Sequence, residues 1–156
     1  AKEVAQSLNT NVNNNPTAAL DPNQDLIVSN TDNYVKIMFR DDMMFETNSE
    51  NPTYAAGTKI SKITTVLQKY PNTLVQVVGH TDSRGTHAYN LALSEKRATN
   101  VGNIINSTGV QNQIFSKGCS FDKPIALNNS DANMGLNRRV EVYLYPNQQS
   151  VIDVCR

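Results

Sequence analysis

The sequence has no net charge, no long apolar run and only two cysteines in its 156 residues. Its 14 basic residues balance its 14 acidic ones, which argues against a surface that attracts nucleic acid or an anionic membrane. No apolar run approaches the roughly 20 residues of a membrane span. The first residues also lack the basic and then apolar layout of a signal peptide. We expect a soluble chain whose charged ligands bind at a local site.

A trimmed or excised fragment would look the same, so the lack of a targeting segment does not assign the chain to the cytoplasm. The two cysteines, Cys119 and Cys155, have neither the spacing nor the companions of a zinc cluster. They either form one disulfide that ties the C-terminal tail to the domain or remain two thiols. The residues alone leave both readings open.

Composition divides the chain into three parts. Residues 1–25 are rich in Asn and have few large apolar side chains, which predicts a linker or N-terminal arm. Val4 and Leu8 at helical spacing allow a short helix within it. A domain is expected over residues 26–147, followed by a C-terminal tail over 148–156. No internal repeat is present.

Hydrophobic periodicity predicts the order β, β, α, β, α, β, β within this domain. LIVS and YVKIMF form a hairpin around NTDN, and a helix capped by Asn51 or Thr53 follows. LVQVVGH reads as a central strand, residues 88–107 as a second helix, and residues 128–133 as a surface loop or short helix. IFSKG and RRVEVYLY supply the last two strands. The expected inner stripe of the first helix is Ile60, Ile63, Leu67 and Tyr70.

This order favours an α+β or α/β sandwich, in which helices pack on one face of a mixed β-sheet. Asp82 follows the end of the central strand, where loops commonly build ligand sites. Arg97 lies on the next helix and is expected to face the same concavity. A carboxylate and a guanidinium together suit a zwitterion, because they bind its ammonium and its carboxylate. The simpler alternative is that the two side chains pair with each other or with solvent.

Four ordered motifs strengthen the first interpretation: HTDSRG, YNLALSEKRA, GCSFDKPIALNN and NRRVEVYL. Together with MMFETNSENP they resemble the OmpA-like peptidoglycan-binding domain family over residues from about 34 to 146. The resemblance implies an OmpA-like two-layer sandwich. It also implies a non-catalytic, noncovalent anchor that binds peptidoglycan through the diaminopimelate of the peptide stem.

In this family the Asp of the HTD motif binds the ligand ammonium and the Arg of LSxxRA binds its carboxylate, which here are Asp82 and Arg97. Thr81, Asn90 and Arg138 match positions that help to hold the ligand. Ser120 stands where the family commonly has the second glycine of GxG. A disulfide between Cys119 and Cys155 would agree with the oxidising periplasm that the resemblance implies.

The resemblance further implies no cofactor and no metal, and a periplasmic protein attached to the outer membrane through segments absent from this chain. Other envelope proteins are candidate partners, and a protein-protein module of an envelope complex is an alternative function. A wall hydrolase built on His80, Asp82 and Glu95 is a weaker alternative, since it lacks a paired carboxylate or metal motif. A zinc site of His80, His87 and Asp82 is disfavoured by the absence of HExxH spacing.

Overall fold

The computed structural model describes residues 2–8, 12–13, 26–31, 33–46, 49–146 and 150–155. In these ranges the helices are α1 (Lys2–Ser7), α2 (Asp41–Met44), α3 (Tyr54–Leu67), α4 (His87–Ser107) and α5 (Asp131–Asn137). The strands are β1 (Val12–Asn13), β2 (Leu26–Asn30), β3 (Val35–Arg40), β4 (Leu74–His80), β5 (Ile114–Gly118) and β6 (Arg139–Tyr145). No described helix is long and apolar enough to cross a membrane.

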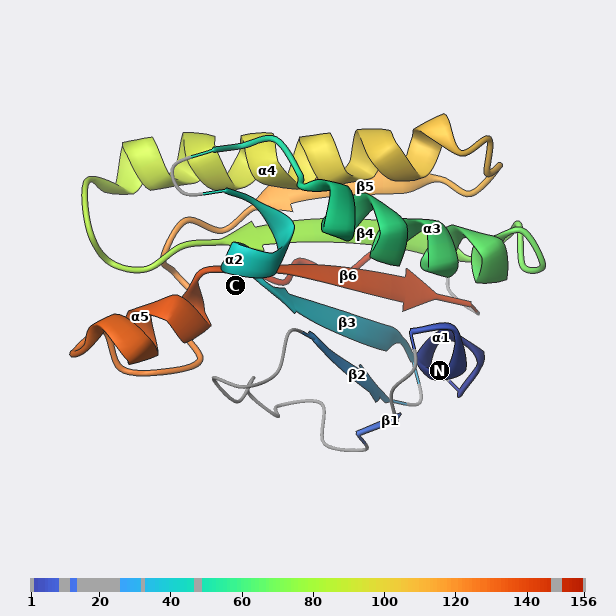
Figure 1. Cartoon of the computed structure of the whole chain (residues 1–156), viewed down its shortest axis with the longest axis horizontal. Helices are drawn as coiled ribbons and strands as arrows, with labels where there is room; N and C mark the ends of the chain where they lie inside the picture. Colours follow the sequence, from blue (N-terminus) through green and yellow to red (C-terminus); the bar gives the residue numbers. More distant parts are fainter. Residues whose placement is uncertain are drawn as a thin grey trace.

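The six strands form one mixed sheet in the order β1-β2-β3-β6-β4-β5 (Figure 1). Strands β2, β3, β6 and β4 pair antiparallel, whereas β1 with β2 and β4 with β5 pair parallel. The chain therefore adopts the expected α+β fold, and the hairpin predicted from LIVS and YVKIMF is confirmed as β2 and β3. The C-terminal strand β6 lies between β3 and β4, in the middle of the sheet.

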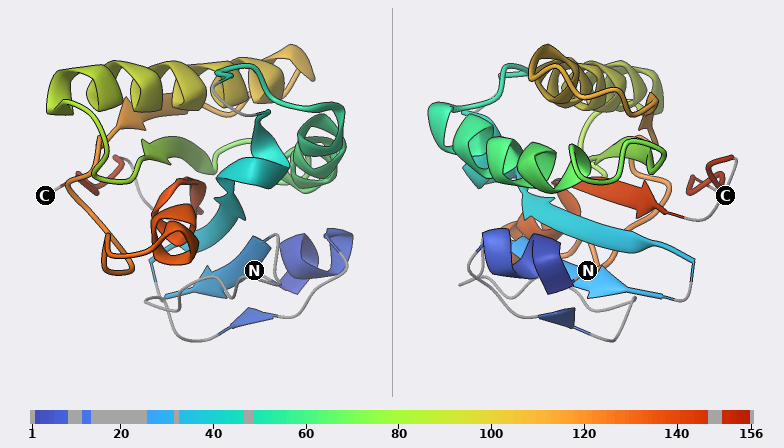
Figure 2. Two further views of the ribbon diagram at one scale, coloured as in Figure 1. Left: turned by 60° about the vertical axis from the view of Figure 1, so that its left-hand side comes forward. Right: turned by 90° about the vertical axis from the view of Figure 1, so that its right-hand side faces the viewer.

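Helices α1, α3 and α4 cover one face of the sheet (Figures 1 and 2). The sequence explains this packing, because Val140, Val142 and Leu144 point to the helices while the residues between them point to the other face. Both faces of β6 are buried. On the face opposite α3 and α4, the short helix α5 packs through Leu136 against Ile27 and Met38 of the neighbouring strands. On the second face the tyrosines of β6 pack against Tyr34 and the C-terminal residues Val151 and Val154.

Helix α3 begins with the expected cap, since the Thr53 side chain accepts a hydrogen bond from the backbone N–H of Ala56 (3.1 Å). Ile60, Ile63 and Leu67 are buried as predicted. Tyr70 is not part of this stripe: the helix ends at Leu67, and Tyr70 is 47% exposed. Its hydroxyl instead donates a hydrogen bond to Glu3 of α1.

Part of the N-terminal segment belongs to the core. Val4, Ala5 and Leu8 are buried against the same cluster that holds the sheet and α3. The composition of residues 1–25 predicted little burial, but a single helical turn needs only a few apolar side chains to cover a neighbouring helix. Residues 14–25 lie outside the described part of the chain, so the boundary at residue 26 stays a prediction.

The disulfide between Cys119 and Cys155 is present, with Cα atoms 5.1 Å apart. It holds residues 150–155 against the face of the sheet opposite α3 and α4, next to Val78 and Tyr143. Of the two readings that the sequence left open, the structure has the bonded one.

Candidate ligand-binding site

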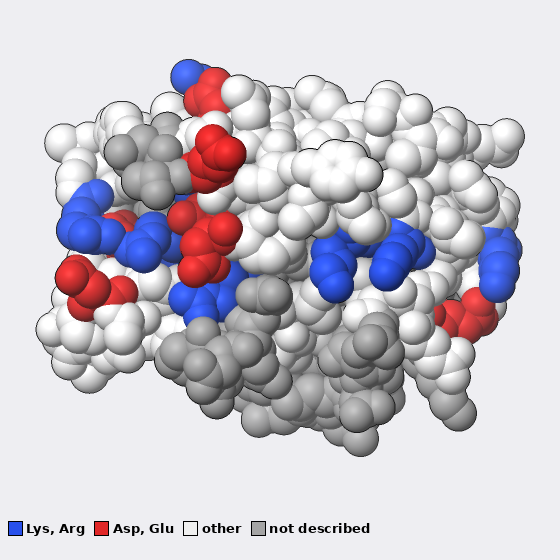
Figure 3. Space-filling model, viewed as in Figure 1, with Lys and Arg blue, Asp and Glu red and all other residues white. Residues whose placement is uncertain are grey.

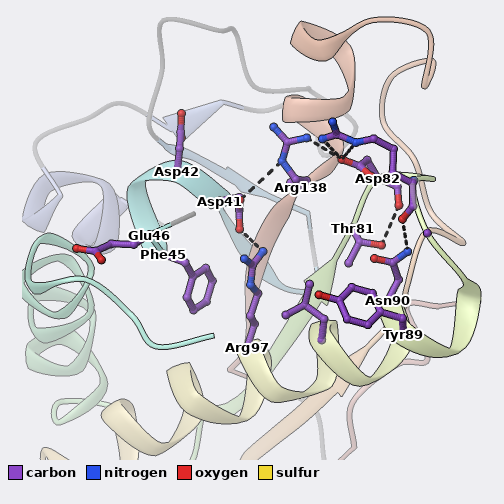
Figure 4. Close-up of a pocket in the computed structure, with 13 residues that line it drawn as sticks. Asp41, Asp42, Phe45, Glu46, Thr81, Asp82, Tyr89, Asn90, Arg97 and Arg138 are labelled. Atoms are coloured by element: carbon purple, nitrogen blue, oxygen red, sulfur yellow. Dashed lines mark hydrogen bonds and ion pairs between the residues drawn. The ribbon is translucent and has the colours of Figure 1, made fainter. Parts of the chain in front are cut away.

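The candidate site is a pocket of about 720 Å³ at the end of β4 and β6, between α2 and α4 (Figure 4). Four segments build it: α2 and the residues after it, the loop that follows β4, the first half of α4, and Arg138 just before β6. The lining residues are Asp41, Asp42, Phe45, Glu46, Thr81, Asp82, Arg84, Gly85, Tyr89, Asn90, Leu93, Arg97 and Arg138.

All five residues predicted to bind a ligand line this one pocket: Thr81, Asp82, Asn90, Arg97 and Arg138. They come from segments up to 57 positions apart (81 to 138), and the antiparallel pairing of β4 with β6 sets Arg139 opposite His80. Arg138 and Arg139 point to opposite faces, as alternation along a strand predicts, so that only Arg138 reaches the pocket. Their role in binding stays a prediction.

Asp82 lies on the loop after β4 and is paired with two arginines. Arg84 donates from its backbone N–H (2.9 Å) and from its side chain (2.8 Å), and Arg138 donates from Nη1 (2.6 Å). Burial alone would raise the pKa of Asp82, but these hydrogen bonds outweigh it and lower the pKa below its ordinary value. Asp82 is therefore a carboxylate at neutral pH.

Arg97 reaches the opposite side of the pocket from α4. Its Nε and Nη2 both donate to the backbone oxygen of Ser49 (3.1 and 2.9 Å), and its guanidinium lies over the ring of Phe45, 4.7 Å from the centroid. Nη1 donates to Asp41. The Arg97 side chain is only 6% exposed. It is held in a fixed orientation, as bidentate recognition of a carboxylate requires.

Asp41 connects the two halves of the site. One carboxylate oxygen accepts from Arg97, and the other lies 3.7 Å from Nε of Arg138. Positive and negative groups thus alternate across the pocket in the order Arg97, Asp41, Arg138, Asp82, Arg84. Figure 3 shows acidic and basic side chains next to one another around α2, without a patch of one sign. Such a site favours a ligand that carries both charges.

Thr81 and Asn90 shape the loop that presents Asp82. The Asn90 side chain donates to the backbone oxygens of Arg84 (2.7 Å) and Thr86 (3.1 Å), which closes the turn onto α4. Gly85 supplies the positive φ of 86° that this turn needs. Thr86 then caps α4. In this structure Asn90 acts on the conformation of the site, whatever further contact it makes with a ligand.

The sequence analysis missed Asp41, Phe45 and Arg84. Arg84 stands two positions after Asp82 in the quoted HTDSRG, so its proximity could have been inferred from local spacing. Asp41 and Phe45 could not, because they meet Arg97 across 56 and 52 positions of sequence. Only the pairing of β3 with β6 brings them to this end of the sheet.

The residues considered for hydrolysis lie apart. His80 points to the face of the sheet opposite α3 and α4, where its Nε2 lies 2.7 Å from Glu141, while Asp82 lines the pocket described above. Glu95 is exposed on α4 and lines neither cavity. His87 pairs with Asp122 (3.0 Å). His80, His87 and Asp82 therefore have separate partners, namely Glu141, Asp122 and the two arginines, which does not favour a shared catalytic or zinc site.

Comparison with known proteins places the chain in a family. Residues 44–138, more than half of the chain, match the OmpA family. The chain belongs to the OmpA family. All residues of the pocket except Asp41 and Asp42 lie within the matched range.

Among its relatives, the probable lipoprotein YiaD of Escherichia coli (strain K12) is 36% identical over 103 residues, which are 65% of this chain and 47% of YiaD. The peptidoglycan-associated lipoprotein of Buchnera aphidicola is 35% identical over 96 residues, which are 61% of this chain and 54% of that protein. The chain thus spans about half the length of these relatives. They, and the outer membrane porin F of Pseudomonas fluorescens, are by name proteins of the outer membrane or lipoproteins.

Solved structures agree with this assignment. The cell wall anchor of the T6SS from Pseudomonas aeruginosa has a TM-score of 0.72 at 28% identity, covering 80% of this chain and 90% of that one. The periplasmic domain of Helicobacter pylori MotB has a TM-score of 0.69 at 23% identity, with coverage of 85% and 87%. The latter supports the fold alone. An OmpA-like domain accounts for most of the described chain.

Proposed function

We propose that this domain binds peptidoglycan noncovalently through the diaminopimelate of the peptide stem, and thereby anchors an envelope protein to the cell wall. The observation that carries the proposal is the position of Asp82 and Arg97 in one pocket. In a peptide stem the free end of diaminopimelate offers an ammonium and a carboxylate on one carbon. Asp82 would receive the ammonium, and the fixed guanidinium of Arg97 would receive the carboxylate.

The names of two similar proteins support this proposal: one is a peptidoglycan-associated lipoprotein and the other a cell wall anchor. Binding of this kind makes and breaks no covalent bond, so the domain is not an enzyme in this proposal and uses no cofactor. The site would work in the periplasm, on a protein attached to the outer membrane. Because the wall repeats its stem many times, several weak sites in one assembly bind strongly together.

A pair of stem peptides tests the ligand. The first is L-Ala-D-Glu-diaminopimelate-D-Ala, and the second has lysine in place of diaminopimelate. Both have the same backbone, but only the first has a carboxylate next to its free ammonium. We expect calorimetry to give saturable binding of the diaminopimelate peptide that is at least tenfold tighter than that of the lysine peptide.

Variants test the site. Arg97→Ala and Asp82→Ala should each weaken binding of the diaminopimelate peptide at least tenfold. Lys96→Ala is the matched control, since it removes a positive charge from the neighbouring position of α4, where the side chain is 63% exposed and outside the pocket. Equal binding of the two peptides, or folded variants that bind as the wild type does, would contradict the proposal. A protein-protein module of an envelope complex would then be the better account.

A further inference from the structure

Both charges that the proposed ligand needs are paired with other side chains of the pocket. Asp82 is bonded to Arg84 and Arg138, and Arg97 is bonded to Asp41. A ligand therefore cannot simply add its charges to free partners. It must take the place of groups that belong to the protein.

The N–H groups of Arg97 define which group has to move. A guanidinium has five N–H donors, and the backbone oxygen of Ser49 takes two of those on Arg97. Asp41 accepts from Nη1, the nitrogen that Ser49 leaves unused. Arg97 itself is buried and fixed by Ser49 and Phe45. Of the two partners, Asp41 is the one whose carboxylate borders the cavity and can rotate about its side-chain bonds.

We propose that the Asp41 carboxylate stands in for the ligand carboxylate before binding, and that binding displaces it from Arg97. This inference rests on the proposed function. Asp41 has the same chemistry as the group that it would mimic, and it binds the same guanidinium. On the other side of the pocket the Arg84 side chain, which is 57% exposed, can leave Asp82 for solvent when the ligand ammonium arrives.

Such a stand-in lowers the preference of the site for a diaminopimelate stem over a lysine stem. A stem with lysine has no carboxylate beside its side-chain ammonium to reach Arg97. Because Asp41 keeps Arg97 paired, the lysine stem leaves no buried cation without a partner. A stem with diaminopimelate has to break the pair between Arg97 and Asp41 before it gains its own. Asp41 therefore weakens binding of the diaminopimelate stem and leaves binding of the lysine stem unaffected.

The test compares Asp41→Asn with Asp42→Asn. Both remove one negative charge from the lining of the pocket, but the Asp42 side chain is 71% exposed and its carboxylate pairs with Arg40, not with Arg97. We expect Asp41→Asn to bind the diaminopimelate peptide about five- to twentyfold more tightly than the wild type and to bind the lysine peptide as the wild type does. Asp42→Asn should change both affinities by less than about twofold.

Three results would overturn the inference. Weaker binding of the diaminopimelate peptide by folded Asp41→Asn would mean that Asp41 receives the ligand ammonium. An equal gain for both peptides would indicate a general charge effect. No change would mean that Asp41 stays on Arg97 in the complex. These results differ from failure of the proposed function, in which the wild type does not prefer the diaminopimelate peptide. If the wild type has no preference but Asp41→Asn prefers the diaminopimelate peptide, the stand-in role of Asp41 still holds. If neither protein binds either peptide, both proposals fail.

A measurement on the wild type avoids dependence on a variant that fails to fold. With labelled arginine and aspartate, NMR follows the Nε–H signal of Arg97 and the carboxyl carbon of Asp41 during titration with the diaminopimelate peptide. Displacement predicts that both signals shift and saturate together, whereas the lysine peptide moves neither. An Asp41 carboxyl signal that is unchanged at saturation with the diaminopimelate peptide would refute the inference.

Discussion

Glu141 is a buried carboxylate in the middle of the sheet, on the face of β6 opposite α3 and α4, and it does not line the ligand pocket. Its side chain is 4% exposed, and its oxygens contact Lys36, His80, Arg139 and Tyr143. Burial opposes the charged form, but Arg139 and the hydrogen bond from His80 outweigh it, so that the pKa of Glu141 falls well below its ordinary value. The carboxylate neutralises cations that the fold has taken out of water.

We expect Glu141→Gln to lower the free energy of unfolding by about 3–5 kcal/mol, because it leaves buried cations without a charged partner. Urea denaturation measures this change. Glu95→Gln is the matched control on an exposed position of α4 and should change the stability by less than about 0.5 kcal/mol. A small effect of Glu141→Gln would show that solvent reaches this cluster.

His80 makes the same cluster sensitive to acid. Burial is the larger cause and the positive charge of Arg139 the second, and both lower the pKa of His80 below its ordinary value of 6.5. The folded state therefore binds this proton less readily than the unfolded state does. The resulting stability is complete above pH 6.5 and is lost as the pH falls below it.

Denaturation series at pH 7.5 and pH 5 should thus show a loss of stability on acidification that is smaller in His80→Gln. Glutamine can still donate a hydrogen bond to Glu141 but does not titrate. The pKa of Glu141 adds a further loss only below about 4.5, outside this interval. An equal loss of stability between pH 7.5 and pH 5 in the wild type and in His80→Gln would contradict the role of His80.

Helix α4 lies unusually close to β4 and β5, and two glycines permit this approach. A Cβ atom on Gly79 would lie 2.3 Å from the backbone oxygen of Ser94, and a Cβ atom on Gly118 would lie 2.3 Å from the side-chain oxygen of the same serine. Because Arg97 is one turn further along α4, this contact sets the depth at which its guanidinium enters the pocket. Ser120, at φ 54°, is held by its own hydrogen bonds to Ser94 and His87, so a serine serves where the family commonly has glycine.

Gly79→Ala should destabilise the protein by about 1–3 kcal/mol or more, since the clash is with backbone and cannot be relieved by a side-chain rotation. Gly57→Ala is the control of opposite sign. It lies in α3 with no atom near the added methyl group and should stabilise the protein by up to about 1 kcal/mol. Thermal or urea unfolding distinguishes the two variants. If Gly79→Ala had the stability of the wild type, α4 would have to be able to shift away from the sheet.

At the scale of the whole molecule, the sheet is covered on both faces by different means. Helices α1, α3 and α4 cover one face. On the other face, α5 packs against β2 and β3 through Leu136, and the disulfide from Cys119 to Cys155 holds the C-terminal residues over the tyrosines of β6. The bond closes a loop of 36 positions that contains α5 and β6. Neither cysteine lines the ligand pocket.

Replacing both cysteines by serine should therefore lower the free energy of unfolding by about 3–4 kcal/mol, as expected for a closed loop of this length, and leave binding of the diaminopimelate peptide unchanged. Denaturation and calorimetry on the same preparation check the two parts. A loss of affinity in the folded variant would show that the covered face and the pocket are coupled.

The sequence by itself determined the order of β2 to β6, α3 and α4, and the candidate pair Asp82 and Arg97, but not the short helix α2 that carries Asp41. Alternation and helical spacing are local properties, so β2 to β6, α3 and α4 could be predicted from neighbours in the chain. The ordered motifs supplied the family, which the match over residues 44–138 confirms. Tyr70 shows the limit of this reasoning, since the pattern continued past the end of the helix.

Only the tertiary structure decided which charges meet. Asp41 reaches Arg97 across 56 positions, and Arg138 reaches Asp82 across the same separation. It also decided that the cysteines are bonded and that Val4 and Leu8 belong to the core. The two ion pairs depend on the register of β3 and β4 against β6, and the disulfide and the contacts of Val4 and Leu8 likewise join segments far apart in the sequence. The physical reason is that the packing of the whole sheet, and not local spacing, fixes which distant segments meet.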